Sequence, residues 1–117
     1  MALEHVLVVD GHRACEVEVA TSHRARMRGL LGRDGIDGAM LLPSGSSVHT
    51  IRMRFPIDVA FLDKESTVVD VVTMVPGRVG RPRLRSRAIL EAGAGSFARW
   101  GLKPGSRVEI VARPDIP

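Results

Sequence analysis

Hydrophobic residues in this chain occur in short runs that are separated by turn-forming residues. The first two runs, His5–Val9 and Cys15–Ala20, flank the tetrapeptide Asp10-Gly11-His12-Arg13. An Asp-Gly pair between apolar runs is typical of a β-hairpin, because both residues tolerate positive φ. Apolar residues also take the odd positions of Cys15–Ala20, which is the period of a half-buried strand. We therefore expect a β-hairpin over residues 5–20.

Further strands are predicted along the rest of the chain. Their runs are Ala39–Leu42, Val48–Met53, Ile57–Leu62, Val68–Val75, Ala88–Ala92 and Arg107–Ala112. Ile57–Leu62 and Val68–Val75 are apolar at almost every position, so we expect both faces of these strands to be covered. Turn signals recur at the spacing of a sandwich or barrel, which predicts a mainly β fold: a single-domain β-sandwich or barrel of about seven or eight short strands with one or two short helices.

Two short helices are predicted between these strands. Helical spacing of apolar residues, i, i+3 and i+4, occurs at Met27, Leu30 and Leu31. Thr21 or Ser22 offers a side-chain oxygen as the N-cap of this helix, and Gly32 is its expected end. Ser96 is expected to cap a second helix of one or two turns.

Composition and length narrow the class of protein. The chain has 117 residues, a length that suits one domain over residues 1–117. Hydrophobic residues make up 44% and charged residues 26%, which excludes an intrinsically disordered chain. No apolar run has the length of a secretory signal or a membrane span, so we expect a cytoplasmic protein with no membrane partner. Cys15 is the one cysteine and has no visible activating base, so we expect a small buried hydrophobe.

Polar residues that could form a binding site cluster around two acids. Asp58 begins an otherwise apolar strand, where a carboxylate is costly unless it is paired or accepts hydrogen bonds. Arg52 and Arg54 are the nearest cations in sequence and suit a carboxylate. Glu91 repeats the pattern of an acid inside an apolar run. One hypothesis is a polar pocket for a small polar or anionic ligand; its candidate residues are His49, Arg52, Arg54, Asp58 and Glu91.

Two other interpretations of these residues stay open. Asp58 and Glu91 could instead fix loop geometry, through Arg52, Arg54 or backbone N–H groups. Alternatively, His49 with Asp58 could act as the acid–base pair of a hydrolase-like enzyme, which requires hydrogen-bond reach between them. The spacings of His and acidic residues match no metal-ligand signature, so we expect no metal and no cofactor.

A second cluster is basic. Lys and Arg number 17 against 13 Asp and Glu, for a net charge of +4. Five arginines lie in the segment 77–87 with no acid among them: Arg78, Arg81, Arg83, Arg85 and Arg87. Such a loop could bind the phosphates of nucleic acid or an acidic protein partner. The 3% aromatic content and the absence of a recognition-helix motif favour a solvated mobile loop instead.

The order of several motifs resembles the DUF192 family, also called UPF0127. The matching segments are Met27–Arg33, Gly38–Leu42, His49–Asp63, Ala88–Glu91 with Gly93 and Gly95, and Gly101–Val108. The resemblance implies a compact mainly β fold with a short helix near the first motif, and it implies no established reaction. Many members carry Trp-Met-Lys-Asn-Thr where this chain has Thr50–Phe55, so contacts of those side chains do not carry over. A non-enzymatic binding module is therefore our leading hypothesis.

Overall fold

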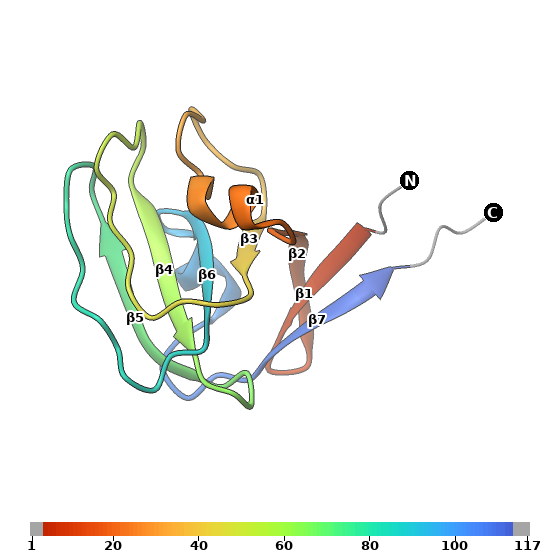
Figure 1. Ribbon diagram of the computed structural model, residues 1–117. Helices are drawn as coiled ribbons and strands as arrows, with labels where there is room; N and C mark the ends of the chain where they lie inside the picture. Colours follow the sequence, from red (N-terminus) through yellow and green to blue (C-terminus); the bar gives the residue numbers. More distant parts are fainter. Residues whose placement is uncertain (1–3, 114–117) are drawn as a thin grey trace.

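The computed structural model describes residues 4–113, and its strands form one sheet (Figure 1). The elements are β1 (Glu4–Val9), β2 (His12–Val19), α1 (His23–Arg28), β3 (Ala39–Leu42), β4 (Ile57–Leu62), β5 (Val68–Met74), β6 (Ala88–Gly93), α2 (Ser96–Trp100) and β7 (Val108–Arg113). The strand order is β5-β4-β6-β3-β2-β1-β7. This arrangement confirms the predicted mainly β architecture. Neither α1 nor α2, the helices of the described residues, is long and apolar enough to cross a membrane.

The sheet curls until the segments before its two edge strands meet. Thr67, just before β5, forms a bridge with Arg107, just before β7. The Val68 amide donates to the Ser106 carbonyl at 2.9 Å, and the Val108 amide donates to the Ser66 carbonyl at 2.9 Å. The sheet is therefore a partly closed barrel, in which the strand edges are joined at one end only.

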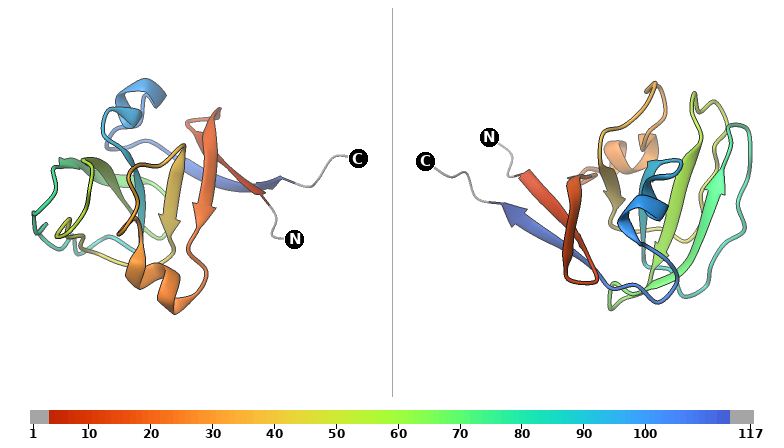
Figure 2. Two further views of the ribbon diagram at one scale, coloured as in Figure 1. Left: turned by 90° about the horizontal axis from the view of Figure 1, so that it is seen from above. Right: turned by 180° about the vertical axis from the view of Figure 1, so that it is seen from behind.

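Two hydrophobic clusters lie on the two faces of this sheet. The inner cluster receives a side chain from every strand: Leu7, Val17, Ala39, Ala60, Val68, Leu90 and Val108. The outer cluster covers β3, β4 and β6 and includes Leu30, Val59, Phe61 and Ile89. In the left view of Figure 2, α1 and α2 lie on opposite faces of the sheet. The inner cluster contains Phe97 of α2, whereas Ala25 of α1 packs against the outer cluster.

Burial along β4 and β5 tests the prediction that both strands are covered on both faces. All six residues of Ile57–Leu62 are buried, which confirms the prediction for β4. The prediction is wrong for β5, where Thr73 is exposed and four neighbouring positions are half-buried. β5 is an edge strand, so its two faces extend beyond the packed clusters.

The predicted hairpin is confirmed at its turn. Asp10 and Gly11 have φ values of 50° and 84°, and Val9 pairs with His12 across them. Positive φ at both central residues is the geometry of a type I′ turn. The Asp10 carboxylate also accepts a hydrogen bond from the Arg107 amide at 2.8 Å, which ties this turn to the start of β7.

The helices differ from prediction at one terminus each. The Ser22 hydroxyl caps α1 by accepting from the Ala25 amide at 3.0 Å, as expected. α1 ends earlier than predicted, at Gly29, because that glycine adopts a φ of 52° instead of continuing the helix to Gly32. α2 begins after Gly95, so Ser96 is inside the helix and not its cap.

The predicted strand Val48–Met53 is wrong. Only His49 forms a bridge within it, opposite Val79, and the chain then turns at Arg52 with a φ of 67°. Thr50 is the cause, because its buried hydroxyl donates to the Val75 carbonyl at 2.7 Å and accepts from the Arg78 amide at 2.9 Å. Backbone hydrogen bonds of 2.8 Å from the Gly80 amide to the Val48 carbonyl and from the Arg83 amide to the Ser46 carbonyl also attach the arginine-rich segment 77–87 to residues 46–50, so this segment is not a loop free in solvent.

Candidate functional site

The two buried acids lie on opposite faces of the sheet. In the antiparallel pairing of β4 with β6, Val59 is opposite Glu91 and Asp58 is opposite Ala92. Residues directly opposite each other share a face, and successive residues of a strand alternate between faces. Glu91 therefore shares the face of the outer cluster with Val59, whereas Asp58 shares the other face with Ala92. The prediction that these acids converge on one pocket is wrong.

Asp58 is held by a hydroxyl and by the start of α2. Its side chain is 4% exposed, and its Oδ1 accepts a hydrogen bond from the Thr73 hydroxyl at 2.7 Å. Its Oδ2 accepts from the backbone amides of Gly95 at 3.0 Å and Phe97 at 3.1 Å. These amides at the N-terminus of α2 would otherwise lack partners. The N-cap of α2 is Gly95, which has no side chain, so Asp58 of β4 caps the helix instead. Its role here is structural.

The arginines predicted to pair with Asp58 lie elsewhere. Arg52 is exposed in its turn and makes no ion pair with any described residue. Arg54 pairs with Asp34 at 3.1 Å, and both of these side chains are exposed. Backbone amides, and not arginine side chains, donate hydrogen bonds to the Asp58 carboxylate. The predicted Asp58–arginine pairing is therefore wrong.

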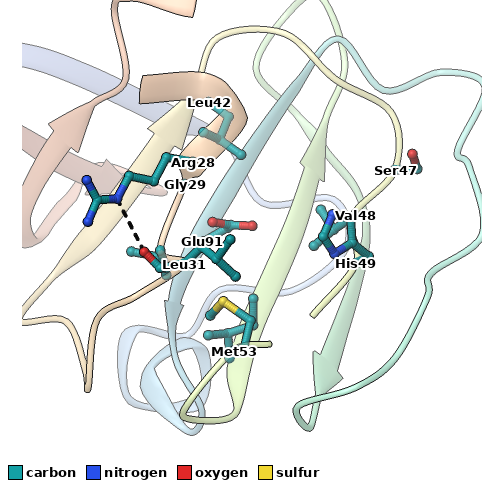
Figure 3. Close-up of a pocket in the computed structure, with 11 residues that line it drawn as sticks. Arg28, Gly29, Leu31, Leu42, Ser47, Val48, His49, Met53 and Glu91 are labelled. Atoms are coloured by element: carbon teal, nitrogen blue, oxygen red, sulfur yellow. Dashed lines mark hydrogen bonds between the residues drawn. The ribbon is translucent and has the colours of Figure 1, made fainter. Parts of the chain in front are cut away.

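Glu91 opens onto a cavity of about 320 Å³ on the outer face (Figure 3). The cavity lies between the residues that follow α1 and the 47–53 segment, and β3, β4 and β6 form its floor. Its apolar walls are Leu30, Leu31, Leu42, Val48, Met53 and Ile57. Its polar lining residues are Arg28, Ser47, His49 and Glu91. The structure thus brings together His49 and Glu91 of the predicted site, and it leaves out Arg52, Arg54 and Asp58.

The Glu91 carboxyl has no hydrogen-bond donor among the groups that the structure describes. The residue is only 5% exposed. Among the described side chains, however, no polar atom is both buried from solvent and without a hydrogen-bond partner. Each Glu91 oxygen is therefore accessible from the cavity. Burial raises the pKa of Glu91 from its ordinary 4.5 to about 7. Both the acid and the carboxylate are then populated near neutral pH.

The residues after α1 leave room beside this carboxyl. A Cβ atom at Gly29 would lie 3.6 Å from Glu91 Oε1, so a larger residue there would cover the carboxyl. The Arg28 Nε donates to the Leu31 carbonyl at 3.4 Å and not to Glu91 (Figure 3). Sequence reasoning missed these wall residues. The available signals were the glycine next to the helical apolar stripe and the acid flanked by apolar residues.

The predicted His49–Asp58 acid–base pair does not form. His49 is exposed at the cavity that Glu91 lines. Asp58 lines a separate cavity with Thr73 and Phe97, and its oxygens already accept from three donors. The hydrolase-like arrangement is therefore wrong for these two residues.

The five arginines of the 77–87 segment have different environments. Arg83 is 16% exposed, pairs with Asp70 at 3.0 Å and places its guanidinium carbon 4.3 Å from the centre of the Phe61 ring. Arg85 is exposed and lies 3.8 Å from Asp63. The remaining three are exposed and make no ion pair with any residue that the structure describes: Arg78, Arg81 and Arg87.

Cys15 is half-buried on β2, whereas the sequence predicts a buried residue. Desolvation, with a smaller effect of the Glu16 carboxylate, raises the pKa of Cys15 to about 11. The thiol is thus protonated at neutral pH, which does not suit a nucleophile. Among the side chains that the structure describes, no three from His, Cys, Asp or Glu gather in the manner of a metal site.

The protein is thus a small, mainly β protein with a partly closed barrel, in which the buried residue Glu91 faces a cavity with mostly apolar walls. The chain belongs to the DUF192 family, described as an uncharacterized ACR, whose pattern matches residues 5–110. It is 32% identical over 101 residues to a UPF0127 protein of Pyrococcus abyssi, covering 82% of this chain and 86% of that protein. It is 36% identical over 85 residues to a UPF0127 protein of Pyrococcus horikoshii, covering 68% and 74%.

Two solved structures share the fold. A protein of unknown function from Novosphingobium aromaticivorans has a TM-score of 0.76 at 23% identity, covering 91% of this chain and 83% of that one. A putative transcription regulator from Sinorhizobium meliloti has a TM-score of 0.79 at 26% identity, covering 93% and 94%. The family is one of unknown function, so the site itself has to supply a functional hypothesis.

Proposed function

We propose that this protein is a non-enzymatic binding module whose small ligand occupies the cavity beside Glu91. The observation that supports this proposal is Glu91, a residue only 5% exposed, whose carboxyl opens onto the cavity and has no donor within the described residues. Taking such a group out of water without a partner is unfavourable by several kcal/mol when it is charged. A ligand that donates to the carboxyl would remove that cost.

The dimensions of the cavity suit a small organic molecule. Its volume of about 320 Å³ falls at the lower end of small-molecule sites, which span about 300–1,000 Å³. Such sites are usually apolar and contain a few polar groups that fix orientation. Here the apolar walls would hold the body of the ligand, and Glu91 would orient its polar end, with His49 at the opening.

The proposal changes the role first expected for the arginines. Arg52 and Arg54 were expected to bind an anionic ligand beside Asp58, but neither lines this cavity. The polar group of the ligand is instead expected to contact Glu91. The ligand is thus small and partly apolar, with a hydrogen-bond donor at one end.

A chemical-shift titration tests the proposal. We expect cyclohexylmethanol, an apolar body with one hydroxyl, to shift the backbone amide signals of Gly29, Leu31 and Met53 in a saturable manner. The Leu31→Trp variant, which fills the cavity, should keep a cooperative thermal transition and lose these shifts. Saturable shifts confined to other surfaces, or equal shifts in the folded Trp variant, would contradict the proposal.

A second candidate function uses the arginine-rich segment. Arg78, Arg81 and Arg87 are exposed and have no acidic partner among the described residues, and a structural neighbour is described as a putative transcription regulator. Binding of nucleic acid through these arginines would weaken steeply as salt increases. A gel-shift assay at low salt should show binding that is lost when all three arginines become Ser. No shift, or the same shift in the triple variant, would exclude this segment as a nucleic-acid site.

A further inference from the structure

We propose that the ligand of this cavity is a primary amine on an apolar body, whose ammonium group pairs with the Glu91 carboxylate. This inference rests on the proposed function and adds the chemical class of the ligand. Binding of such a ligand would convert Glu91 from a mixture of protonated and ionised forms to the ionised form. A proton would therefore leave the protein as the amine binds.

The charge environment of Glu91 supports a cationic ligand. Its register neighbours are Met40 on β3 and Val59 on β4, both apolar. The described ionisable groups that line the same cavity are Arg28 and His49, and neither forms an ion pair with Glu91. The ionised carboxylate thus lacks a counter-charge within the described residues. An ammonium group supplies that charge together with hydrogen-bond donors.

The walls of the cavity determine the rest of the ligand. In Figure 3, Leu31, Leu42 and Met53 lie around the Glu91 carboxyl, and Ile57 also lines the cavity. Apolar contact with these side chains would remove a hydrocarbon body from water, at about 25 cal/mol per Å² of buried apolar surface. A fully polar amine would leave these apolar walls in contact with water. We therefore expect a ligand with an ammonium group on a hydrocarbon body.

Three probes with the same body and different head groups test the inference. The probes are cyclohexylmethylamine, cyclohexylmethanol and cyclohexanecarboxylate, titrated by calorimetry and by amide chemical shifts. We expect the amine to bind most tightly and to release about half a proton at pH 7, measured from the difference between two buffers of unequal ionisation enthalpy. Its affinity should rise by about two orders of magnitude from pH 5 to pH 8, as Glu91 ionises and the amine stays protonated.

Two variants separate the carboxyl from the cavity. Glu91→Gln keeps the shape of the side chain, so it should retain the alcohol, lose the preference for the amine and release no proton. Glu109→Gln changes an exposed glutamate on β7, so it should leave all three probes unaffected. An equal fall of amine affinity in both variants would show an effect of net charge and would overturn the inference.

The outcomes distinguish the inference from the proposed function. Binding of the alcohol as tightly as the amine, without proton release, would overturn the ammonium assignment and leave the binding cavity supported. Tighter binding of the carboxylate would also overturn it, since Glu91 would then act as a protonated donor. Failure of all three probes to shift amides around the cavity at millimolar concentration would contradict both proposals.

Discussion

Replacement of Glu91 by Gln is expected to remove a pH-dependent loss of stability. Glu91 has a pKa of about 7 in the folded protein and an ordinary value of 4.5. A group whose pKa is higher in the folded state supports folding fully below the unfolded value, and this contribution disappears as pH rises through the folded value. The window for Glu91 is therefore pH 4.5 to 7. Above it, the folded protein holds a buried carboxylate that the unfolded chain exposes to water.

The size of the effect follows from the two pKa values. A difference of about 2.5 units corresponds to about 3 kcal/mol, at about 1.4 kcal/mol per unit. The amide of Gln does not titrate, so the Glu91→Gln variant should lack this loss. The stability difference between variant and natural protein should thus grow by about 3 kcal/mol in favour of the variant between pH 4.5 and pH 8.

Urea unfolding followed by circular dichroism measures this difference. With a denaturant slope of about 1–3 kcal/mol per M, the unfolding midpoints should separate by about 1–3 M more at pH 8 than at pH 4.5. The Glu109→Gln variant is the matched control, because its side chain is exposed, and its midpoint should follow that of the natural protein. Parallel pH profiles for the Glu91→Gln variant and the natural protein would refute the assignment of a buried, unpartnered carboxyl.

Three further predictions test other parts of the fold. Asp58→Asn should destabilise the protein by about 2–3 kcal/mol in urea unfolding, because an NH2 group replaces one of the two buried oxygens that together accept three hydrogen bonds; a change below about 0.5 kcal/mol would contradict its capping role. Thr50→Val should lower the free energy of unfolding by about 1–3 kcal/mol and speed hydrogen exchange at the Arg78 amide, which donates to the Thr50 hydroxyl. Unchanged exchange at Arg78 would contradict the role of this hydrogen bond. Arg83→Ala should lower the thermal midpoint more than Arg81→Ala, since Arg83 packs on Phe61, and equal effects would show that this packing is unimportant.

The sequence predicted correctly those elements whose geometry is set by residues adjacent in the chain. The Asp10-Gly11 turn was predictable because two adjacent residues with positive φ define its geometry. The burial of β4 followed from six residues with almost no polar position. The 48–53 segment was not predictable in this way. Its extended pattern is overridden by Thr50, whose hydroxyl bonds residues 25 and 28 positions further along the chain.

The site depended on long-range register, which the sequence does not reveal. Asp58 and Glu91 look alike as acids in apolar runs, but the pairing of β4 with β6 directs them to opposite faces. A shift of one residue in this register would have placed both acids on one face. The partners of Asp58 are amides 37 and 39 residues away, and backbone amides carry no signal in the sequence.

Direct titration of the Glu91 carboxyl is the sharpest test of this account. The side-chain carbonyl carbon can be followed by ¹³C NMR from pH 3 to pH 9, with the Glu91→Gln spectrum identifying the signal. We expect a single transition with a midpoint at about pH 7, the value that burial without a partner produces. A midpoint at or below the ordinary 4.5 would mean that the carboxyl is hydrated or paired. That result would contradict both the binding site and the amine ligand proposed for it.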